Sequence, residues 1–389
     1  MSEILRLLTP ESQRLLATLE PISGKSDLVG LVSALRKQGL DAELVAQVVT
    51  QLRLRHRARV KFGDFADQML FSEAGLEQAS RLAVAAHHAN RFRSTGVTSV
   101  ADLGCGIGAD SLAFASMGLD VVAVERDPET AALAAYNLAA FANAKVEIAD
   151  AENYQPHTQA LWFDPARRNL ETKTESRQML SPADFSPNLD HVFEAARTKP
   201  TGVKLGPAFP HELIPADCEA QWVSHEGDLV ELTLWFNGLG KVGRSALMLG
   251  DSSHSMHAEN IELAGIGELG QYLYEPDSSL IRSGLMGNLA NSLNLVTVAS
   301  GIAYLSGDLV SSPWLKAYEI YDVLPLDEKR LSAWCRENDI GVVEIKKRGV
   351  DITPEALRPK LKLKGAGAVT MVLTKVGDAR KALICKPIR

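Results

Sequence analysis

The chain has 389 residues, enough for two or three domains with substantial hydrophobic cores. Hydrophobic residues make up 46% and charged residues 23%, and no apolar stretch is long enough to span a bilayer, which argues against membrane and disordered proteins. The first residues lack the apolar core of a signal peptide. Four scattered cysteines without a C-x-x-C pair or histidine cluster predict a reducing cytoplasm, with neither a disulfide framework nor a metal site.

The formal net charge of −7 is unevenly distributed along the chain. Residues 1–95 hold 13 Lys/Arg and 10 Asp/Glu (+3), residues 96–309 hold 12 and 28 (−16), and residues 310–389 hold 16 and 10 (+6). An acidic middle repels a polyanion, so any such partner should be bound by the basic ends.

The first 92 residues are predicted to form a helical domain. Thr9-Pro10 and Asp41 are typical helix starts. A basic run then follows, comprising Arg53, Arg55, Arg57, Arg59 and Lys61. Two interpretations remain open: a solvated helix end whose cations face the C-terminal dipole, or a track for nucleic-acid phosphates. The segment from Met69 to Gln78 leads into a predicted helix that runs to about Arg91.

A glycine-rich turn follows a short apolar strand at 97–101. Gly104, Gly106 and Gly108 alternate along this turn, and a helix begins at Ala109. Glycines allow the backbone to approach a ligand closely. About twenty residues later a second apolar strand ends in Glu125, which can accept hydrogen bonds from ribose hydroxyls.

This pattern fits two nucleoside-bearing cofactors. Gly104 to Ala109 also matches the G-x-G-x-x-G/A signature of dinucleotide sites. A diphosphate would, however, be repelled by Asp102 at the end of the first strand. A carboxylate there suits the amino group of S-adenosylmethionine, and Asp150, after a third strand, would face the adenine amine. The pattern therefore favours the methyl donor.

Residues 70–236 resemble the class I S-adenosylmethionine-dependent methyltransferases. The resemblance implies a Rossmann-like, doubly wound α/β sheet with an antiparallel C-terminal hairpin, expected here at 220–224 and 229–235. It also implies a set of cofactor-binding residues. These are Asp102, Gly104, Gly106, Gly108, Glu125, Asp150, Ala151 and Gln78. In related enzymes the segment before the glycine strand covers the cofactor, so Phe71 is a further candidate contact.

Asp164 and Pro165 stand at the family's fourth-strand motif and are the expected catalytic residues. A carboxylate and a neighbouring carbonyl can orient the N–H groups of an exocyclic base amine toward the methyl group. Enzymes that methylate amines usually carry an aromatic residue two places after the proline, on which the base stacks, whereas this chain has Arg167. Candidate substrate contacts are Arg167, Arg168 and Lys61, with Lys204 and His211 as further positioning residues or as plain strand-end salt bridges.

The sequence Asp164-Pro-Ala-Arg167 also resembles RNA uridine C5-methyltransferases, which need a cysteine nucleophile. No cysteine follows the fifth strand. Cys218 comes later and lies between two acids, which disfavour its thiolate. Methylation of a base nitrogen is therefore preferred.

The remaining chain divides in two. Residues 237–309 read as an irregular extension with one helix expected at 278–293, and their role is not readable. Residues 310–389 predict a basic α+β module that resembles the THUMP-like domain at the C-terminus of some bacterial methyltransferases, and true THUMP domains bind RNA.

The predicted organisation is therefore 1–92, 93–309 and 310–389. The predicted function is S-adenosylmethionine-dependent methylation of a base nitrogen in tRNA or rRNA in the cytoplasm, with RNA bound through the basic ends and with no metal. Two alternatives remain: an RNA-binding protein that senses the cofactor without turnover, and a small-molecule methyltransferase.

Overall fold

The computed structural model describes residues 3–22, 24–167 and 181–388. Contacts divide the chain into two compact units, 1–219 with 233–241, and 220–232 with 242–389. The N-terminal helices thus group with the first strands, and residues 242–309 group with the C-terminal region. The three-domain division expected from the sequence stays a prediction.

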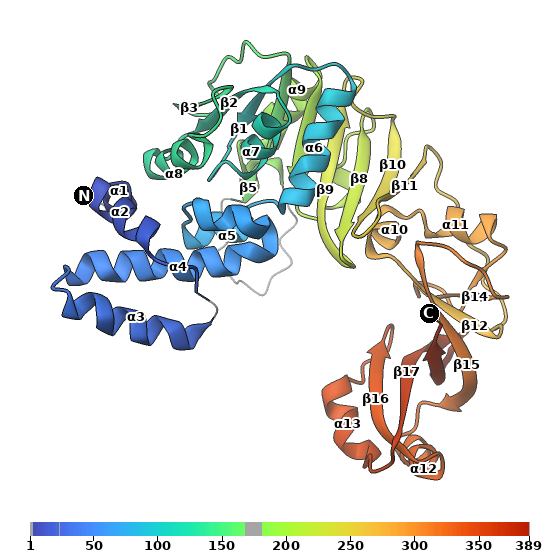
Figure 1. Cartoon of the computed structure of the whole chain (residues 1–389). Helices are drawn as coiled ribbons and strands as arrows, with labels where there is room; N and C mark the ends of the chain where they lie inside the picture. The colour runs from blue at the N-terminus through green and yellow to red at the C-terminus, as the bar shows by residue number, and fades with distance from the viewer. Residues whose placement is uncertain (1–2, 23, 168–180, 389) are drawn as a thin grey trace. The chain divides into compact units, whose positions relative to one another are not determined.

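The predicted mixed α/β fold with a large sheet is confirmed (Figure 1). The strand order is β11-β10-β8-β9-β7-β4-β1-β2-β3, and the neighbours β4-β1, β1-β2, β2-β3 and β4-β7 are parallel. The strands are β1 (Ser99–Leu103), β2 (Asp120–Glu125), β3 (Ala144–Ile148), β4 (Ala160–Phe163), β7 (Thr201–Leu205), β8 (Glu219–His225), β9 (Asp228–Phe236), β10 (Gly243–Leu249) and β11 (His254–Ala258). The β8-β9 pair does not end the sheet, because β10 and β11 continue it. A separate two-stranded ribbon joins β5 (Ala166–Arg167) to β6 (Phe185–Ser186).

Helices precede and connect the strands of the first unit. They are α1 (Glu3–Leu7), α2 (Pro10–Thr18), α3 (Lys25–Lys37), α4 (Ala42–Phe62), α5 (Glu73–Gln78), α6 (Leu82–Ser94), α7 (Ala109–Ser116), α8 (Pro128–Leu138) and α9 (Leu189–Ala196), with 3-10 turns η1 (Gly63–Gln68), η2 (Pro182–Asp184) and η3 (His211–Leu213). Thr9 and Asp41 cap α2 and α4 through their side chains, as the sequence predicts. The helix expected to run to about Arg91 is α6, which ends at Ser94, and the segment that leads into it contains a further short helix, α5.

Aromatic rings from α6, α7, β4 and β9 form the centre of the first unit's core. Trp162 of β4 lies 5.8 Å from Trp235 of β9 and 5.7 Å from Phe114 of α7, ring centre to ring centre. Phe92 of α6 contacts the same rings edge-on. Gly202 of β7 leaves room for them, because a Cβ there would come within 2.6 Å of Trp162.

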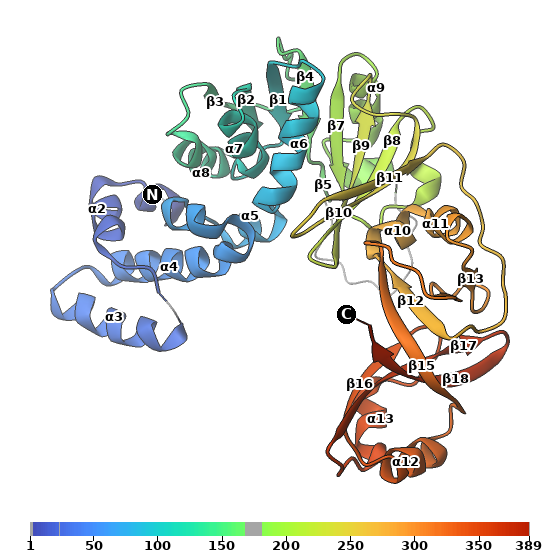
Figure 2. The same cartoon turned by 45° about the vertical axis from the view of Figure 1, so that its right-hand side comes forward.

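A second sheet has the order β13-β14-β12-β15-β18-β17-β16 and belongs to the second unit (Figure 2). Its strands are β12 (Tyr272–Pro276), β13 (Val296–Thr297), β14 (Leu305–Gly307), β15 (Leu315–Pro325), β16 (Ile340–Lys347), β17 (Gly367–Val376) and β18 (Ala379–Pro387). The helices α12 (Glu328–Glu337) and α13 (Pro354–Leu361) pack on one face. Residues 310–389 contain both strands and helices, as expected of an α+β module, but β12, β13 and β14 come from residues assigned to the irregular extension.

The helix expected at 278–293 is interrupted. It forms α10 (Ser278–Ser283) and α11 (Met286–Ser292), because Gly284 adopts a left-handed conformation with φ +84° that ends the first helix.

Gly202→Ala should lower the unfolding free energy by about 1–3 kcal/mol, because the added methyl group overpacks the tryptophan pair. Thermal unfolding would measure the change. Gly206→Ala is the matched control, since a Cβ there meets nothing within 4 Å. Equal melting temperatures for the two variants would contradict this account of the core.

Candidate active site

Three acidic residues meet at the carboxyl edge of the parallel strands. The register pairs Leu103 of β1 with Val124 of β2 and with Phe163 of β4. The next residues along these strands are Gly104, Glu125 and Asp164, so both acids flank the start of the glycine loop. Asp102 lies within β1, two residues earlier.

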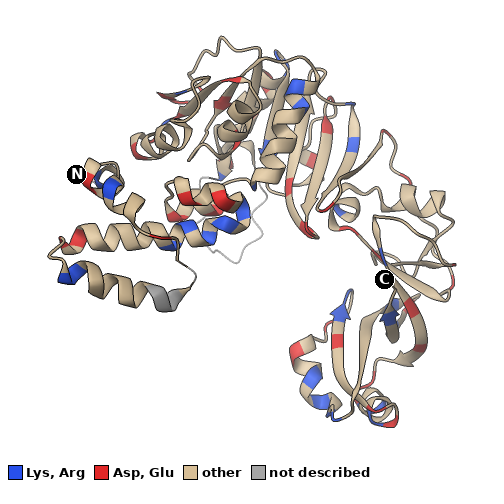
Figure 3. Cartoon of the chain, viewed as in Figure 1, with Lys and Arg blue, Asp and Glu red and all other residues tan. Residues whose placement is uncertain are grey.

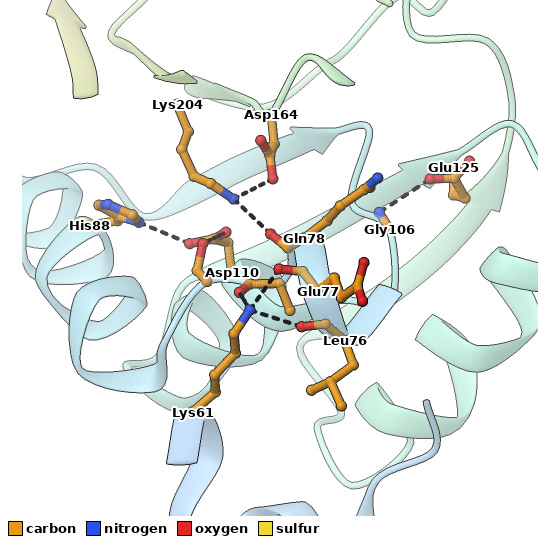
Figure 4. A network of polar contacts seen from close by, with 12 residues as sticks. Lys61, Leu76, Glu77, Gln78, His88, Gly106, Asp110, Glu125, Asp164 and Lys204 are labelled. Carbon is orange, nitrogen blue, oxygen red and sulfur yellow. Dashed lines mark hydrogen bonds and ion pairs between the residues drawn. The ribbon is translucent and has the colours of Figure 1, made fainter. Parts of the chain in front are cut away.

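The glycine loop requires glycine for its backbone conformation. Gly104, Gly106 and Gly108 have φ values of +96°, +54° and +83°, a region that other residues rarely adopt. The Gly106 amide donates to Glu125 Oε2 at 3.1 Å, and the amide of Asp127 donates to the other carboxylate oxygen at 3.0 Å. Glu125 is therefore fixed against the loop (Figure 4).

Asp102 has one oxygen without a partner among the described residues. The side chain is 1% exposed; its Oδ2 accepts from Ser111 Oγ at 2.5 Å, whereas the buried Oδ1 has no hydrogen bond. Burial, followed by the nearby carboxylate of Asp110, raises the pKa of Asp102 to about 8. The carboxyl group is thus poised to be stabilised by a positive charge.

Asp110, the second residue of α7, is equally buried but fully engaged. Ser80 Oγ donates to its Oδ2 at 2.7 Å, and His88 Nδ1 lies 2.8 Å from its Oδ1. Burial acts to raise the pKa of Asp110, but the interactions with His88 and Ser80 outweigh it and the pKa is lowered. The His88 ring also stacks on Trp162 at 4.4 Å.

Asp164 forms an ion pair with Lys204, the fourth residue of β7. Lys204 Nζ lies 2.5 Å from Asp164 Oδ2 and 3.4 Å from the main-chain oxygen of Gln78 (Figure 4). The Lys204 side chain is 12% exposed and that of Asp164 is 32% exposed. The pair therefore lies at a site that solvent reaches.

The short helix α5 closes over the glycine loop. A Cβ on Gly75 would come within 2.5 Å of the Ile107 side chain, so glycine is what allows this contact. Asn137 of α8 donates to the main-chain oxygens of Leu70 and Ile107, which ties the segment before α5 to the loop. In Figure 4 the side chain of Gln78 extends toward the side of Gly106 and Glu125.

Lys61, predicted as a substrate contact, caps α5 instead. Its ammonium donates to the main-chain oxygens of Leu76, Glu77 and Ala79 at 2.7–2.8 Å, which engages all three of its N–H groups. Burial, and then the neighbouring ammonium of Lys204, lower its pKa to about 8.

The other cations of the basic run contact the segment 64–77, and Figure 3 shows the basic end of α4 next to acidic residues of α5. Arg53 and Arg57 both pair with Glu73, and Arg59 pairs with Asp67. Arg55 is buried and donates to the main-chain oxygen of Met69. Arg53 and Arg57 stay exposed although both pair with Glu73, so both interpretations of the basic run stay predictions.

The other predicted contact residues that the structure describes do not take part in the interactions given above. Asp150 is exposed and accepts from the Glu152 amide at 2.9 Å, with Ala151 in the same turn after β3. Arg167 is exposed in β5, opposite Phe185. Arg168 lies outside the described residues. Phe71 is 1% exposed, and its backbone bonds Gln51 on both sides, so it belongs to the core.

Cys218 is unsuited to be a nucleophile. Burial, and then Asp217 and Glu219, raise its pKa to about 12. All four cysteines are buried thiols. In the part of the chain that the structure describes, no cluster of side chains could hold a metal ion, and no helix is both long and apolar enough to cross a membrane.

Sequence patterns missed several residues that shape the site. Ser111, Ser80, His88 and Asn137 act over sequence distances of nine to sixty-seven residues, which no local spacing reveals. Gly75 offered one signal, because a glycine inside a short helix often marks a close approach.

An acid-lined edge beside a glycine loop, on a Rossmann-like sheet, defines a site for a nucleoside-bearing cofactor. Comparisons with known proteins narrow this class. An uncharacterized S-adenosylmethionine-dependent methyltransferase of Mycobacterium tuberculosis (strain CDC 1551) is 31% identical over 352 residues, covering 86% of this chain and 95% of that protein, and the protein described in the same words from strain H37Rv matches equally. The chain belongs to the family of S-adenosylmethionine-dependent methyltransferases.

Other matches concern the fold and the chain ends. The structure titled "Crystal structure of putative methyltransferase from Porphyromonas gingivalis W83" is similar with a TM-score of 0.74 at 21% identity, covering 94% of this chain and 98% of that one. The THUMP domain-like family matches residues 315–387, and a domain of unknown function matches residues 1–58. The expected THUMP-like C-terminus is confirmed.

Asp102→Asn should change how stability depends on pH. The folded-state pKa of about 8 exceeds the unfolded value of about 3.9, so the native protein holds a proton that the unfolded chain releases. The wild type therefore loses stability through this group as pH rises from about 4 to about 8, and asparagine does not. The melting temperature of the variant minus that of the wild type should increase across this window.

Asp120→Asn provides the control, because Asp120 is exposed at the opposite end of β2. The same comparison with the wild type is made for this variant. A difference for Asp102→Asn that stays flat with pH would contradict the burial argument.

Proposed function

We propose that this methyltransferase modifies a base nitrogen in RNA, in tRNA or rRNA, with Asp164 and Pro165 at the acceptor amine. The observation that carries this proposal is the closeness of the acceptor acid to the donor loop. The main-chain oxygen of Asp164 lies 3.7 Å from the point that a Cβ on Gly104 would occupy. A base held by Asp164 would thus adjoin the loop that binds the donor.

The residues at the edge fit the methyl donor. The unpaired Oδ1 of Asp102 suits the ammonium of S-adenosylmethionine, and Glu125 suits its ribose hydroxyls. Asp150 and Ala151 would border the adenine, and Gln78 would cover the cofactor from α5. Around Gly106 there is open space where a side chain would otherwise stand, so the backbones of Gly104, Gly106 and Gly108 can line the donor.

The transfer itself needs alignment more than acid–base chemistry. S-adenosylmethionine, when bound, would supply an electrophilic methyl group on a sulfonium whose leaving group is a thioether. The amine lone pair forms the N–CH3 bond as the S–CH3 bond breaks, and the nitrogen then loses one proton to water. Asp164 would orient the amine by accepting a hydrogen bond from one of its N–H groups. A C5 reaction on uracil is disfavoured, because the raised pKa of Cys218 leaves no ready thiolate there.

RNA binding is supported mainly by the C-terminal unit. It contains the THUMP-like match. Lys347, Lys362 and Lys364 are exposed, and none of them forms an ion pair with a described residue. Their charges are available to phosphates. In the α4 run, Arg53 and Arg57 are exposed as well, but both pair with Glu73. Arg167, exposed beside the acceptor motif, is a further proposed substrate contact, together with Arg168.

Radiolabelled methyl transfer into total RNA from cells that lack the protein would test the function. Wild-type protein should label RNA, and Asp164→Asn should lower the rate by at least about a hundredfold, because the amine loses its orienting carboxylate. Asp120→Asn should retain full activity. If RNA stays unlabelled while the protein binds the donor, the RNA assignment fails and small molecules become the substrates to test.

The triple variant Lys347→Gln, Lys362→Gln, Lys364→Gln should raise KM for RNA and leave kcat unchanged. The slope of log affinity against log salt should shrink by roughly 0.7–0.9 for each phosphate that the variant no longer neutralises. Lys145→Gln is the control, since Lys145 already pairs with Glu147. An unchanged slope in the triple variant would remove these lysines from the RNA interface.

A further inference from the structure

The Asp164–Lys204 pair presents a hydrogen-bond acceptor and a donor side by side. The two groups are 2.5 Å apart, and they come from strand ends that neighbour each other in the sheet. A carboxylate accepts only, and an ammonium donates only. A ligand that binds across both must therefore offer a donor next to an acceptor.

The contacts of Lys204 differ in strength. The ion pair with Asp164 is short, whereas the 3.4 Å contact with the Gln78 oxygen is at the weak end of hydrogen bonding. The end of α5 does not depend on that contact, because Lys61 already binds the oxygens of Leu76, Glu77 and Ala79. A better acceptor on a substrate can replace the Gln78 oxygen without releasing α5.

The pairing edges of the bases differ in whether they offer a hydrogen-bond donor next to an acceptor. In adenine the N6 amine is a donor next to the N1 acceptor, and in cytosine the N4 amine is a donor next to the N3 acceptor. In guanine the N2 amine lies between the N1–H donor and the N3 acceptor, so a guanine that enters with its pairing edge toward the site places N1–H against the ammonium. Uracil has no amine. A donor opposed to a donor leaves both groups unpaired, and this penalty gives strong discrimination.

On the basis of the proposed RNA base methylation, we propose that Lys204 recognises the ring nitrogen beside the acceptor amine. For a base that enters with its pairing edge toward the site, adenine at N6 or cytosine at N4 is then accepted, and guanine at N2 is rejected. Lys204 acts as a specificity-determining residue, and Asp164 orients the amine.

The first test is the identity of the labelled nucleoside after digestion of the methylated RNA. N6-methyladenosine or N4-methylcytidine supports the inference. N2-methylguanosine, a methylated uridine or a ribose methyl group overturns it while leaving the RNA methyltransferase function intact. Absence of any RNA label overturns the proposed function itself, so the two failures are distinguishable.

The second test removes the ring nitrogen from the substrate. A short RNA around the labelled site is prepared with the natural nucleoside, and again with 1-deazaadenosine or 3-deazacytidine in its place. The wild type should lose about tenfold to a hundredfold in kcat/KM on the deaza RNA, the usual size for a hydrogen bond from a charged donor. Lys204→Met should be slower on the natural RNA but should lose less than about threefold on the deaza exchange.

Two variants separate this role from a structural one. Lys204→Arg keeps a charged donor and should retain part of the discrimination. Lys199→Met removes a lysine just before the start of β7, which donates to the oxygens of Pro156 and Thr158, and should discriminate as the wild type does. Calorimetric binding of S-adenosylhomocysteine shows whether each variant is folded. Equal deaza penalties in the wild type and in a folded Lys204→Met protein would overturn the inference.

Discussion

Mutual repulsion among carboxyl groups is the constraint around which this site is arranged. Parallel strands bring Asp102, Glu125 and Asp164 together at one edge of the sheet, and Asp110 joins them from the first turn of α7. Each acid is accommodated differently. His88 and Ser80 engage Asp110, loop amides hold Glu125, and Lys204 pairs with Asp164. Asp102 receives only the Ser111 hydroxyl among the described residues, which does not outweigh its burial and the nearby Asp110 carboxylate, so its pKa is raised. A ligand that brings positive charge to Asp102 would offset the repulsion among these carboxyl groups. A diphosphate would increase that repulsion.

The basic run of α4 supports the same edge of the sheet indirectly, through the segment that contacts the glycine loop. Its cations hold the segment from Asp67 to Ala79 along the helix, and that segment carries Gly75 onto Ile107 of the glycine loop. Lys61 and Lys204 approach the end of α5 from α4 and β7 respectively. A helix of six residues is too short to be stable alone. These capping interactions, together with the glycine contact, keep α5 over the site.

Local patterns predicted the parts of the site that depend on local geometry. The glycine turn, the acids at strand ends and the helix caps each follow from a few neighbouring residues, and the structure contains them. Contacts between distant segments were not predictable. Ser111 bonds Asp102 and Asn137 bonds Leu70 because the fold brings them together. From the sequence alone, the alternating arginines look like surface charge. Their pairing with Glu73 and Asp67 becomes visible only once the acidic segment 64–77 folds back along α4.

The C-terminal sheet includes strands from both sides of residue 310. Composition suggested a self-contained module from residue 310, yet β12 pairs with β15 over five residues, and β14 pairs with β12 in turn. Glu275 of β12 binds Lys346 at 2.7 Å and accepts from Tyr318 at 3.2 Å, and the Lys346 interaction helps to keep the pKa of Glu275 low despite burial. A fragment that began at 310 would expose the edge of β15 and leave Lys346 without this partner. The strands of the extension therefore complete the sheet of the THUMP-like domain, so RNA-binding measurements on this unit must include residues 272–307.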